Sequence, residues 1–581
     1  MKYKCCEPEK VQDIRELVVR ASKLFGDKIA FKEIGRDKTV VEYTFRHLEQ
    51  DRNALGTRLL DLDMGGYHFA LISENSIAWV LSYLAVVGGA GVVVPLDKEL
   101  LAENIAELLS HSDSDVVICS ETFLPMIISI LDECPGIQSV IVMNPTKAYL
   151  HKRKNVTFYD LPTLVAQGIK LLLQGDHAYT NQEIDPECMC EILFTSGTTG
   201  PNKGVMLSHK NLMADLYGFM HYIKVTPVSI SVLPIHHSFE STCHMLGIIF
   251  TGNTLCFNDS LKHMMDNLVR FKPGMSLMVP LFLEAMYKRI WQEAKREELD
   301  SHLRYGIWFS NLLRVFGIDG RRLFFKPILD KFGGDLKQIV CGGAPLRTEL
   351  IKKFDEIGIN VINGYGITEC APVISTNASD WKVSGTVGKV LPGCQVRIAN
   401  PDKSGNGEIQ VKSDIVMMGY YKDEVNTKAV FTDDGYFMTG DMGRLSRNNF
   451  LFITGRKKNL IILSNGKNIC PEELEEAIAS AIPYIKEVMV YSVTAGEQEM
   501  INADVFLDIQ YIADNGIPDI QDQLNQDIRK LNNTLPVYKR INNVNIMEHE
   551  FEKTTTKKIK RQVEMKKRRE YNDGLRVQEN S

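Results

Sequence analysis

The sequence predicts an α/β protein in which a large N-terminal domain of parallel α/β sheets carries a small β-rich subdomain and is followed by a small α+β domain. Three observations lead to this prediction. Apolar runs of strand length alternate with helix-like segments, shorter strands rich in turn residues dominate from about residue 380, and a third pattern begins after Gly455. Alternating strands and helices are typical of a parallel sheet covered by helices on both faces.

The first strands are short apolar runs, HFALIS, GVVVPL, DVVICS and SVIVMN, at 68–73, 91–96, 115–120 and 139–144. Runs of this length between polar or turn residues predict buried strands. FLPMIISILDE at 123–133 has a helical pattern between two of them. The alternation continues with LKQIVCGGAPL at 336–346, the helix-like RTELIKKFDEIG, and INVINGYG.

The later strands differ from the first group. GEIQVKS and FLFITG are separated by turn residues, which predicts a compact β-rich unit over about 380–455. Beyond it, the helix PEELEEAIAS, the strands EVMVYSV and INADVFLDI, and the helix DIQDQLNQDIRKLNNTL predict a unit of ordinary domain size. We therefore predict a large domain at 1–455, containing the β-rich subdomain, and a small C-terminal domain with a basic tail at 456–581.

Composition excludes several classes of protein. Hydrophobic residues make up 44% of the 581 positions and charged residues 24%, as in soluble globular proteins. A net charge of -6 favours no nucleic-acid partner. Twelve scattered cysteines without repeated C-x-x-C pairs provide no zinc framework and fit a reducing compartment. The N-terminus lacks an apolar signal segment, so we expect a cytoplasmic protein.

One segment could be mistaken for a membrane span. IAWVLSYLAVVGGAGVVVPL at 77–96 has twenty residues without a charge, which is long enough to cross a bilayer. Its internal glycines and the change to a valine run instead predict a buried helix, a turn, and a buried strand that ends at Pro95.

The loop FTSGTTGPNKGV at 194–205 is the first motif that suggests chemistry. It lies between an apolar strand-like segment and a helix that begins near Ser208. Glycines allow close approach of the backbone to a ligand, hydroxyl and bare N–H groups form an anion-binding concavity, and Lys203 adds positive charge. A run of glycine, serine and threonine alone is more often a surface turn.

Other motifs decide between these readings, because together they resemble one family. FTSGTTGPNKGV resembles the phosphate loop of the adenylate-forming enzymes, which include acyl-CoA synthetases, firefly luciferase and the adenylation domains of peptide synthetases. CGGAPL at 341–346, GYGITE at 364–369, DGYFMTGDMGRL at 434–445 and ITGRKKNLIILSNGKNICPEELE at 453–475 resemble further motifs of that family, in the same order. The resemblance covers roughly residues 25–562, and ordered matches are far more specific than one motif.

The resemblance implies a nucleotide site made of many residues. The ligands expected for the triphosphate of ATP are Thr195, Ser196, Gly197, Thr198, Thr199, Gly200 and Lys203. The expected adenine side is Tyr365, stacked against Gly343 and Ala344. Thr368 would donate to the α-phosphate, Glu369 would hold Mg²⁺, and Asp441 and Arg456 would bind the ribose. A carboxylate suits Mg²⁺, which keeps much of its water and shares phosphate oxygens.

The substrate side is indicated by His236 and His237 in LPIHHSFE. The resemblance places His237 at the junction of an acyl tunnel and the nucleotide. Members that activate amino acids carry an aspartate hereabouts, whereas the nearest acid here is Glu240. An unpaired ammonium in a dry pocket is costly, so the sequence argues against amino-acid substrates, with Glu240 as the open point.

The tail run FEKTTTKKIKRQ at 551–562 resembles the last family motif and places its catalytic lysine at Lys558. Two residues depart from the motif: Glu552 replaces proline and Lys557 replaces glycine. Glycine permits positive φ there, so Lys557 predicts a differently shaped loop or a shared charge. Lys553, Lys560 and Arg561 are expected in solvent or on the domain surface. Peripheral contact of the basic tail with an anionic membrane is also open.

The resemblance further implies a mobile C-terminal domain. Its hinge would be Lys458, and Gly466 and Lys467 would face the entry path of coenzyme A, although a solvated lysine is an equally simple reading of Lys467. Rotation of the domain would separate formation of acyl-AMP from thioester formation.

The expected function is activation of a medium- or long-chain fatty acid with ATP and Mg²⁺, then transfer to coenzyme A. Two alternatives remain open. The acceptor would instead be a separate acyl-carrier protein, or the chain would be a nucleotide-binding regulator without activity.

Overall fold

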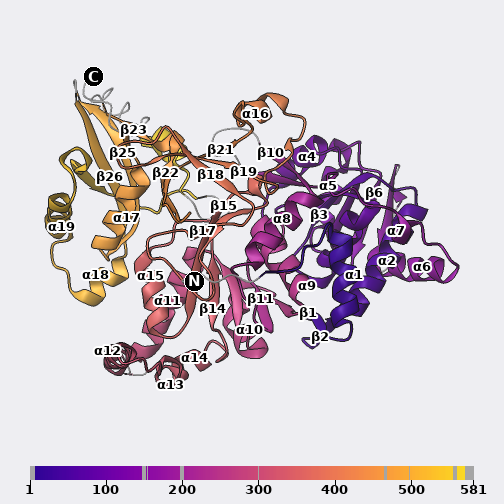
Figure 1. Cartoon of the computed structure of the whole chain (residues 1–581), viewed down its shortest axis with the longest axis horizontal. Helices are drawn as coiled ribbons and strands as arrows, with labels where there is room; N and C mark the ends of the chain where they lie inside the picture. Colours follow the sequence, from indigo (N-terminus) through magenta and orange to yellow (C-terminus); the bar gives the residue numbers. More distant parts are fainter. Residues whose placement is uncertain are drawn as a thin grey trace.

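The computed structural model describes residues 7–146, 152–153, 155–195, 202–296, 298, 300–463, 468–495, 498–553 and 559–568. Within them, two sheets of nine strands form the large body, with a four-stranded sheet and a smaller C-terminal unit beside it (Figure 1). The predicted α/β class is therefore confirmed. Parallel strands dominate both large sheets because helical crossovers connect them.

The first large sheet contains the four predicted N-terminal strands. Its spatial order is β20 (Gly419–Tyr420), β10 (Lys203–Ser208), β9 (Met189–Thr195), β4 (Gly91–Pro95), β3 (Tyr67–Ile72), β5 (Val116–Ser120), β6 (Ser139–Met143), β8 (Val156–Asp160) and β7 (Lys152–Arg153). The strands β4, β3, β5, β6 and β8 are parallel, whereas β9 and β10 form an antiparallel pair. The two strands that flank the glycine-rich loop therefore run side by side.

The second large sheet brings together strands from very distant parts of the chain. Its order is β17 (Lys389–Val390), β16 (Val373–Thr376), β15 (Asn360–Gly366), β14 (Gln338–Cys341), β13 (Met275–Met278), β11 (Val228–Ser231), β12 (Thr254–Phe257), β1 (Ile29–Ile34) and β2 (Val40–Thr44). The strands β12, β11, β13, β14 and β15 are parallel. One buried cluster of apolar side chains connects the two large sheets.

Helices cover both sheets in the manner that the alternating pattern predicts. They are α1 (Ile14–Phe25), α2 (Phe45–Asp61), α3 (Ile77–Ala85), α4 (Ala102–His111), α5 (Leu124–Ile130), α6 (Leu161–Leu173), α7 (Ala178–Asn181), α8 (His209–Met220), α9 (Gly247–Thr251), α10 (Met264–Phe271), α11 (Pro280–Arg296), α12 (Asp300–Val315), α13 (Arg321–Phe324), α14 (Lys326–Asp330) and α15 (Thr348–Glu356). The expected helices at 123–133 and after Leu346 correspond to α5 and α15.

The apolar segment at 77–96 contains the predicted buried helix and buried strand. It forms α3, a short π-helical segment at Val86–Ala90 in place of the expected turn, and strand β4. Gly89 interrupts the π-helical segment with φ of 130°, which favours glycine. The helix is buried among other helices, so the apolar composition reflects packing. In the described residues, we find no helix with the length and apolar character that a membrane span requires.

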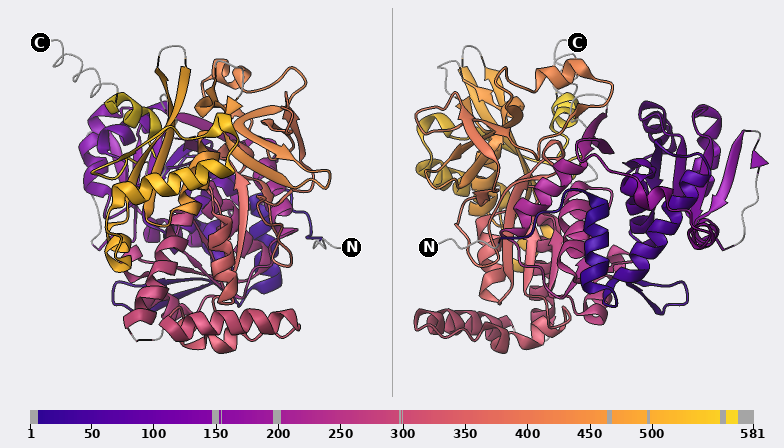
Figure 2. Two further views of the ribbon diagram at one scale, coloured as in Figure 1. Left: turned by 90° about the vertical axis from the view of Figure 1, so that its left-hand side faces the viewer. Right: turned by 45° about the vertical axis from the view of Figure 1, so that its right-hand side comes forward.

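The β-rich subdomain and the C-terminal unit lie next to the second large sheet (Figures 1 and 2). The subdomain sheet has the order β18 (Gln395–Ala399), β19 (Gly407–Lys412), β21 (Phe437–Leu445) and β22 (Leu451–Arg456), with α16 (Glu424–Ala429) nearby in sequence. The C-terminal unit contains β23 (Ile461–Ile462), β24 (Asn468–Ile469), α17 (Pro471–Ala481), β25 (Ile485–Ala495), β26 (Gln498–Leu507), α18 (Ile509–Asn515), α19 (Ile520–Thr534) and β27 (Asn543–Ile546).

The C-terminal unit has an apolar core of its own, formed by side chains between Ile461 and Ile541. Polar contacts connect it to the large body. Arg347 of α15 donates to the carbonyl of Ala479, at 3.2 Å, and Lys288 of α11 pairs with Asp508 at 3.2 Å. A unit with a separate core and polar contacts is suited to move relative to its neighbour.

Candidate active site

A cleft of about 2470 Å³ lies between the large body, the β-rich subdomain and the C-terminal unit. Every predicted site residue in the described part of the chain lines it: Thr195, Lys203, His237, Gly343, Ala344, Tyr365, Thr368, Glu369, Asp441, Arg456 and Lys458. Typical pockets for one drug-sized ligand measure about 300–1,000 Å³. The cleft is therefore large enough for more than one substrate.

Eight predicted residues lie outside the described residues: Ser196, Gly197, Thr198, Thr199, Gly200, Gly466, Lys467 and Lys558. The residues that flank the glycine-rich loop are described. Thr195 at the end of β9 and Lys203 at the start of β10 are register partners, and both line the cleft. Both ends of this loop are therefore at the cleft.

Tyr365, Asp441 and Arg456 form one polar cluster, although they come from three strands. The Oη atom of Tyr365 donates to Oδ2 of Asp441 at 2.6 Å, and Nε of Arg456 lies 2.7 Å from Oδ1 of the same carboxylate. Asp441 and Arg456 are also register partners in the antiparallel pair β21–β22. The Asp441 side chain is only 4% exposed, whereas that of Arg456 is 40% exposed and can reach a ligand.

The electrostatics of this cluster keep the tyrosine neutral. Burial and the neighbouring Asp441 carboxylate raise the pKa of Tyr365 well above its usual value. The hydroxyl therefore remains a donor to Asp441 at physiological pH. The donors Tyr365 and Arg456 fix the orientation of the Asp441 carboxylate, whose remaining lone pairs can accept hydrogen bonds from a ligand.

A second cluster joins Glu369, Tyr420 and Lys203. Glu369 belongs to the short helix Thr368–Cys370 after β15, and its Oε1 accepts a hydrogen bond from Tyr420 at 3.0 Å. The Nζ atom of Lys203 lies 4.7 Å from the centre of the Tyr420 ring. Burial and Glu369 raise the pKa of Tyr420. Sequence reasoning missed Tyr420, because β20 reaches the site only through pairing with β10.

The protein side chains in the cleft could hold Mg²⁺ only together with oxygen atoms of a bound ligand. Among the described residues, no group of three His, Cys, Asp or Glu side chains is placed to hold a metal ion. Glu369 supplies one carboxylate in the cleft. This arrangement fits Mg²⁺, which protein sites commonly bind through one or two carboxylates together with phosphates and water.

The two histidines occupy the wall of the cleft. Their ring centres are 4.2 Å apart, and both residues line the cleft. His236 is buried, and burial, followed by the charges of His237 and Lys98, lowers the pKa of its imidazole. The His236 imidazole also lies 3.7 Å from Asp97, measured from Nε2 to Oδ1, so this wall of the cleft is polar.

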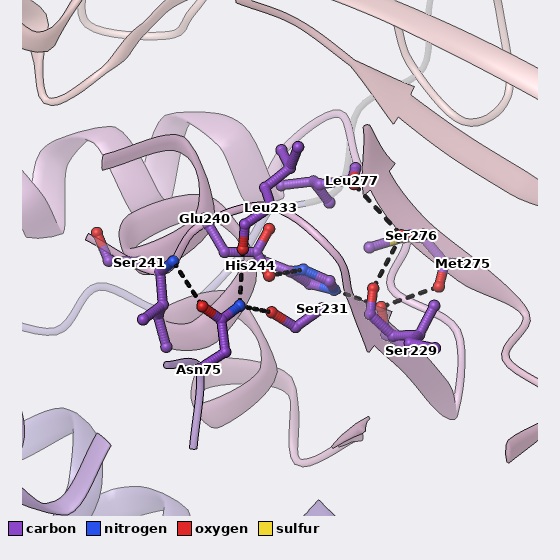
Figure 3. A network of polar contacts seen from close by, with 12 residues as sticks. Asn75, Ser229, Ser231, Leu233, Glu240, Ser241, His244, Met275, Ser276 and Leu277 are labelled. Atoms are coloured by element: carbon purple, nitrogen blue, oxygen red, sulfur yellow. Dashed lines mark hydrogen bonds and ion pairs between the residues drawn. The ribbon is translucent and has the colours of Figure 1, made fainter. Parts of the chain in front are cut away.

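Glu240 is engaged away from the cleft, which answers the point left open by the sequence. Its Oε1 lies 2.8 Å from Nδ1 of His244, whose Nε2 contacts the hydroxyl of Ser229 (Figure 3). Glu240 is 0% exposed. Since it is absent from the described lining of the cleft, it is not placed to pair with the ammonium of an amino acid.

The predicted hinge lies where the C-terminal unit begins. Lys458 is in the short helix Lys457–Asn459, directly after Arg456 and β22. Burial, followed by the charge of Arg456, lowers the pKa of Lys458. Lys457 pairs with Glu408 at 2.7 Å on the subdomain. The connection between the two units therefore lies at the cleft, which Arg456 and Lys458 both line.

The segment that carries Lys558 is held at both ends. Lys553 and Ile559 form an antiparallel bridge, and both line the cleft. Glu552, which stands where the resemblance leads us to expect proline, connects the described residues on the two sides of this segment. Its backbone N–H donates to Glu564 at 2.9 Å, its carbonyl accepts from the N–H of Lys560 at 2.8 Å, and its carboxylate pairs with Lys560 at 3.1 Å. A proline has no N–H for the first of these bonds.

The other tail cations form ion pairs, and Lys553, Lys560 and Arg561 line the cleft, whereas the sequence predicts them in solvent or on the domain surface. Lys553 pairs with Glu550 at 2.8 Å and with Glu487, Arg561 pairs with Glu475, and Arg568 pairs with Asp504. Residues 561–568 are helical. Lys557 lies outside the described residues, so the effect of its replacing glycine stays a prediction.

Comparison with known proteins adds independent information. Residues 18–421 match the family model described as AMP-binding enzyme, and residues 458–572 match that of the AMP-binding enzyme C-terminal domain. The long-chain-fatty-acid–CoA ligase 5 of Rattus norvegicus is 31% identical over 447 residues, which are 72% of this chain and 64% of that protein. The match therefore spans slightly under two thirds of the length of this relative.

Two further comparisons are with a curated ligase that is named for a different acyl acceptor and with a solved structure. A chloroplastic long-chain-fatty-acid–[acyl-carrier-protein] ligase of Arabidopsis thaliana is 27% identical over 527 residues, covering 79% of this chain and 71% of that protein. The ATP-bound structure of MatB from Rhodopseudomonas palustris superimposes with a TM-score of 0.71 at 23% identity, covering 95% of this chain and 98% of that one. The last comparison shows that the two chains share a fold.

Proposed function

We propose that this chain, which belongs to the AMP-binding enzyme family, activates a medium- or long-chain fatty acid to acyl-AMP with release of pyrophosphate and then transfers the acyl group to the thiol of coenzyme A. One observation carries this proposal: motif residues from widely separated segments line a single cleft around the Tyr365–Asp441–Arg456 cluster and Glu369. Relatives that are named long-chain-fatty-acid–CoA ligases support the choice of acid and acceptor.

The first step joins two anions, which explains the residue types in the cleft. A carboxylate oxygen of the acid attacks the α-phosphorus of ATP, the bond to the bridging oxygen breaks, and pyrophosphate leaves. Positive charge between the reactants lowers the barrier, and Lys203 and Lys558 are the side chains proposed to supply it. Mg²⁺, held by Glu369 and phosphate oxygens, would neutralise part of the phosphate charge.

The nucleotide roles follow from the geometry of the clusters. We assign adenine to the face of Tyr365 beside Gly343 and Ala344, and the ribose hydroxyls to Asp441 and Arg456. Tyr365 is oriented for this role, because its hydroxyl is already bonded to Asp441. Thr368, next to Glu369, would donate to the α-phosphate, and His237 would position the acid.

The second step requires a different arrangement of the C-terminal unit. The thiol attacks the acyl carbon, the mixed anhydride breaks, and AMP leaves. We propose that rotation about Lys458 withdraws Lys558 and brings the segment with Gly466 and Lys467 to the thiol. The separate core of the C-terminal unit and its polar contacts with α11 and α15 support such a movement.

A separate acyl-carrier protein is the alternative acceptor, because a relative named as an acyl-carrier-protein ligase aligns over 79% of the chain. The test is hydroxylamine trapping of acyl-AMP over acids of graded length, with amino acids as the negative series. Product is then measured with coenzyme A or with a phosphopantetheinylated carrier.

Hydroxamate from fatty acids but not amino acids, followed by acyl-CoA, is the expected result. Turnover only with the carrier protein would identify the carrier protein, and not coenzyme A, as the acyl acceptor. Tight ATP binding without hydroxamate from any acid would instead identify a regulator and contradict the enzymatic proposal.

A further inference from the structure

The side chain of Asn75 connects the two large sheets at the wall of the cleft. Asn75 lies between β3 of the first sheet and α3, whereas its partners belong to the end of β11 in the second sheet and the chain that follows it. Asn75 also lines the cleft, together with Leu233 and Pro234. The roles proposed above for the cleft residues make no use of this asparagine.

Both N–H groups and the oxygen of the Asn75 amide are used on one short stretch, which we call segment 231–237. Nδ2 of Asn75 donates to Oγ of Ser231 at 2.9 Å and to the carbonyl of Leu233 at 2.7 Å (Figure 3). Oδ1 accepts from the N–H of Ile235 at 3.1 Å. A carboxamide offers donors and an acceptor on one rigid group, whereas a carboxylate only accepts and a hydroxyl has one proton to donate. The three partners therefore match asparagine and fix the direction of its amide.

The bonds of Asn75 hold the backbone on both sides of Pro234. Leu233 precedes the proline and Ile235 follows it, so the peptide groups that flank the proline are bonded to one amide. The carbonyl of Pro234 in turn accepts a hydrogen bond from the N–H of His237 at 3.1 Å. His237 is thus one hydrogen bond away from the backbone that Asn75 holds.

The chain after His237 is fixed to the core by a second polar group. The carbonyl of His237 accepts from the N–H of Glu240 at 2.9 Å. The Glu240 carboxylate bonds His244, whose ring contacts Ser229 on β11 (Figure 3). Glu240, His244 and Ser229 are buried. Segment 231–237 is therefore held from the second sheet at its far end and from the first sheet by Asn75.

Burial makes the Asn75 bonds hard to replace. Leu233 is 6% exposed and Ile235 is 1% exposed, so their peptide groups would not regain full hydration if the amide were lost. A buried peptide group without a partner is costly, and the segment would shift to find other partners. A displacement of about 1 Å at a group that positions a substrate can cost about 10²-fold in rate.

We propose that Asn75 is a positioning residue for the acid: by holding the backbone on both sides of Pro234, its amide sets the place of His237 against the acyl group. The inference rests on the proposed function, because it requires an acid beside His237. Asn75 acts through the backbone of segment 231–237 and needs no contact with the substrate.

The proposal predicts an effect on the acid and not on the nucleotide. The nucleotide cluster is held by bonds of its own, from Tyr365 and Arg456 to Asp441. The three bonds of the Asn75 side chain all go to segment 231–237. Loss of the amide should therefore change how the acid is bound and oriented, with the ATP site intact.

Steady-state kinetics of two variants test this separation. Asn75→Asp keeps the shape of the side chain but replaces its donors by a carboxylate that faces the carbonyl of Leu233. We expect kcat/KM for dodecanoate to fall at least about tenfold and KM for ATP to change less than about twofold. Ser231→Ala removes one of the three bonds and should cost about two- to threefold, again for the acid alone.

Asn532→Asp is the matched control. The Asn532 amide also bonds backbone on both its sides, donating to the carbonyl of Ile541 at 2.9 Å and accepting from its N–H at 2.9 Å. Asn532 lies on α19 of the C-terminal unit and is absent from the described lining of the cleft. Its variant should lower Tm and leave the constants for acid and ATP unchanged. A purely structural role for Asn75 would make the two variants behave alike.

Calorimetry gives a measurement that needs no turnover. The ligands are dodecanoyl-sulfamoyl-adenosine, a stable analogue of acyl-AMP, and AMP. Asn75→Asp should bind the analogue at least about tenfold more weakly than the unmodified protein does, with equal affinity for AMP. Failure of the proposed function would appear as an unmodified protein that binds the analogue and forms no acyl-AMP from any acid. The loss of analogue affinity in Asn75→Asp would still decide the role of Asn75.

Three results would overturn the role of Asn75. These are equal losses for acid and ATP in Asn75→Asp, an analogue affinity that this variant leaves unchanged, or an unmodified protein that binds the analogue no more tightly than AMP. The last result would leave no acyl group for His237 to meet. If Asn75→Asp does not fold, Ser231→Ala decides, because it changes a single hydroxyl and should show the same selective loss on a smaller scale.

Discussion

The hydroxyl of Tyr365 lies 2.6 Å from Oδ2 of Asp441, so that a tyrosine of the GYGITE motif holds the aspartate of the T-G-D motif. The sequence assigns one residue to adenine and the other to ribose. Their direct contact links the two halves of the proposed nucleotide site. Substitutions at these two residues should therefore have non-additive effects.

Asp441→Asn should weaken the use of ATP far more than the use of the acid. The variant retains the shape of the side chain but loses the charge that accepts from Tyr365 and Arg456. Hydrogen bonds to charged groups contribute about 1.5–3 kcal/mol, so kcat/KM for ATP should fall about 10- to 100-fold. Asp434→Asn, an exposed acid paired with Arg397, is the matched control. Equal effects of the two variants on ATP would contradict the assignment.

Lys558→Ala should remove adenylate formation and spare the thioester step. The lysine is proposed to place charge between two anions in the first step alone, and such contacts are worth about 10²-fold or more in rate. Pyrophosphate release measures the first step, and conversion of supplied acyl-AMP with coenzyme A measures the second. Lys560→Ala, which loses an ion pair with Glu552, should leave both rates nearly unchanged.

Lys557→Gly tests the departure from the family motif. If Lys558 alone supplies the charge, restoring glycine should preserve adenylate formation, and only the double variant with Lys558→Ala should abolish it. A large loss from Lys557→Gly alone would show that the two lysines share the role.

Glu369→Gln should lower the rate of adenylate formation about 10²-fold, because a neutral amide binds Mg²⁺ much less well than a carboxylate. The rate should become dependent on higher Mg²⁺ concentrations. Tyr420→Phe removes one hydrogen bond to Glu369 and should cost several-fold in rate, with the carboxylate still present. A Mg²⁺ dependence that is unchanged in Glu369→Gln would place the metal elsewhere.

His209 should make the fold less stable in mild acid. It is 4% exposed at the start of α8, and burial lowers the pKa of its imidazole to about 4. The unfolded chain has a histidine pKa of about 6.5, so it binds more protons than the folded chain between these values. Stability is therefore complete above pH ~6.5 and falls by up to about 3 kcal/mol as the pH drops toward 4.

Urea unfolding from pH 4 to pH 8 measures this slope. In His209→Gln the slope should be smaller, whereas His263→Gln, at an exposed histidine paired with Asp259, should retain it. An identical slope in all three proteins would assign the acid sensitivity to other groups.

Local patterns were sufficient for much of the fold. The runs at 68–73, 91–96, 115–120 and 139–144 became β3, β4, β5 and β6, because short apolar runs between polar residues have few other ways to bury their side chains. The local pattern also predicted the helix and the strand within 77–96. Eleven residues that line the cleft also followed from motifs, since the order and spacing of motifs are sequence properties.

The sequence by itself determined the α/β class, the family, and a set of candidate site residues. The tertiary structure alone decided which of these side chains meet. Tyr420 joins Glu369 only because β20 pairs with β10, Glu240 is turned to His244 and away from the cleft, and Glu552 bonds Glu564 in place of the expected proline. The exposed face of α12 was also invisible to pattern reasoning. An apolar helical stripe predicts burial, whereas the described part of the chain leaves Tyr305, Trp308 and Val315 mainly exposed.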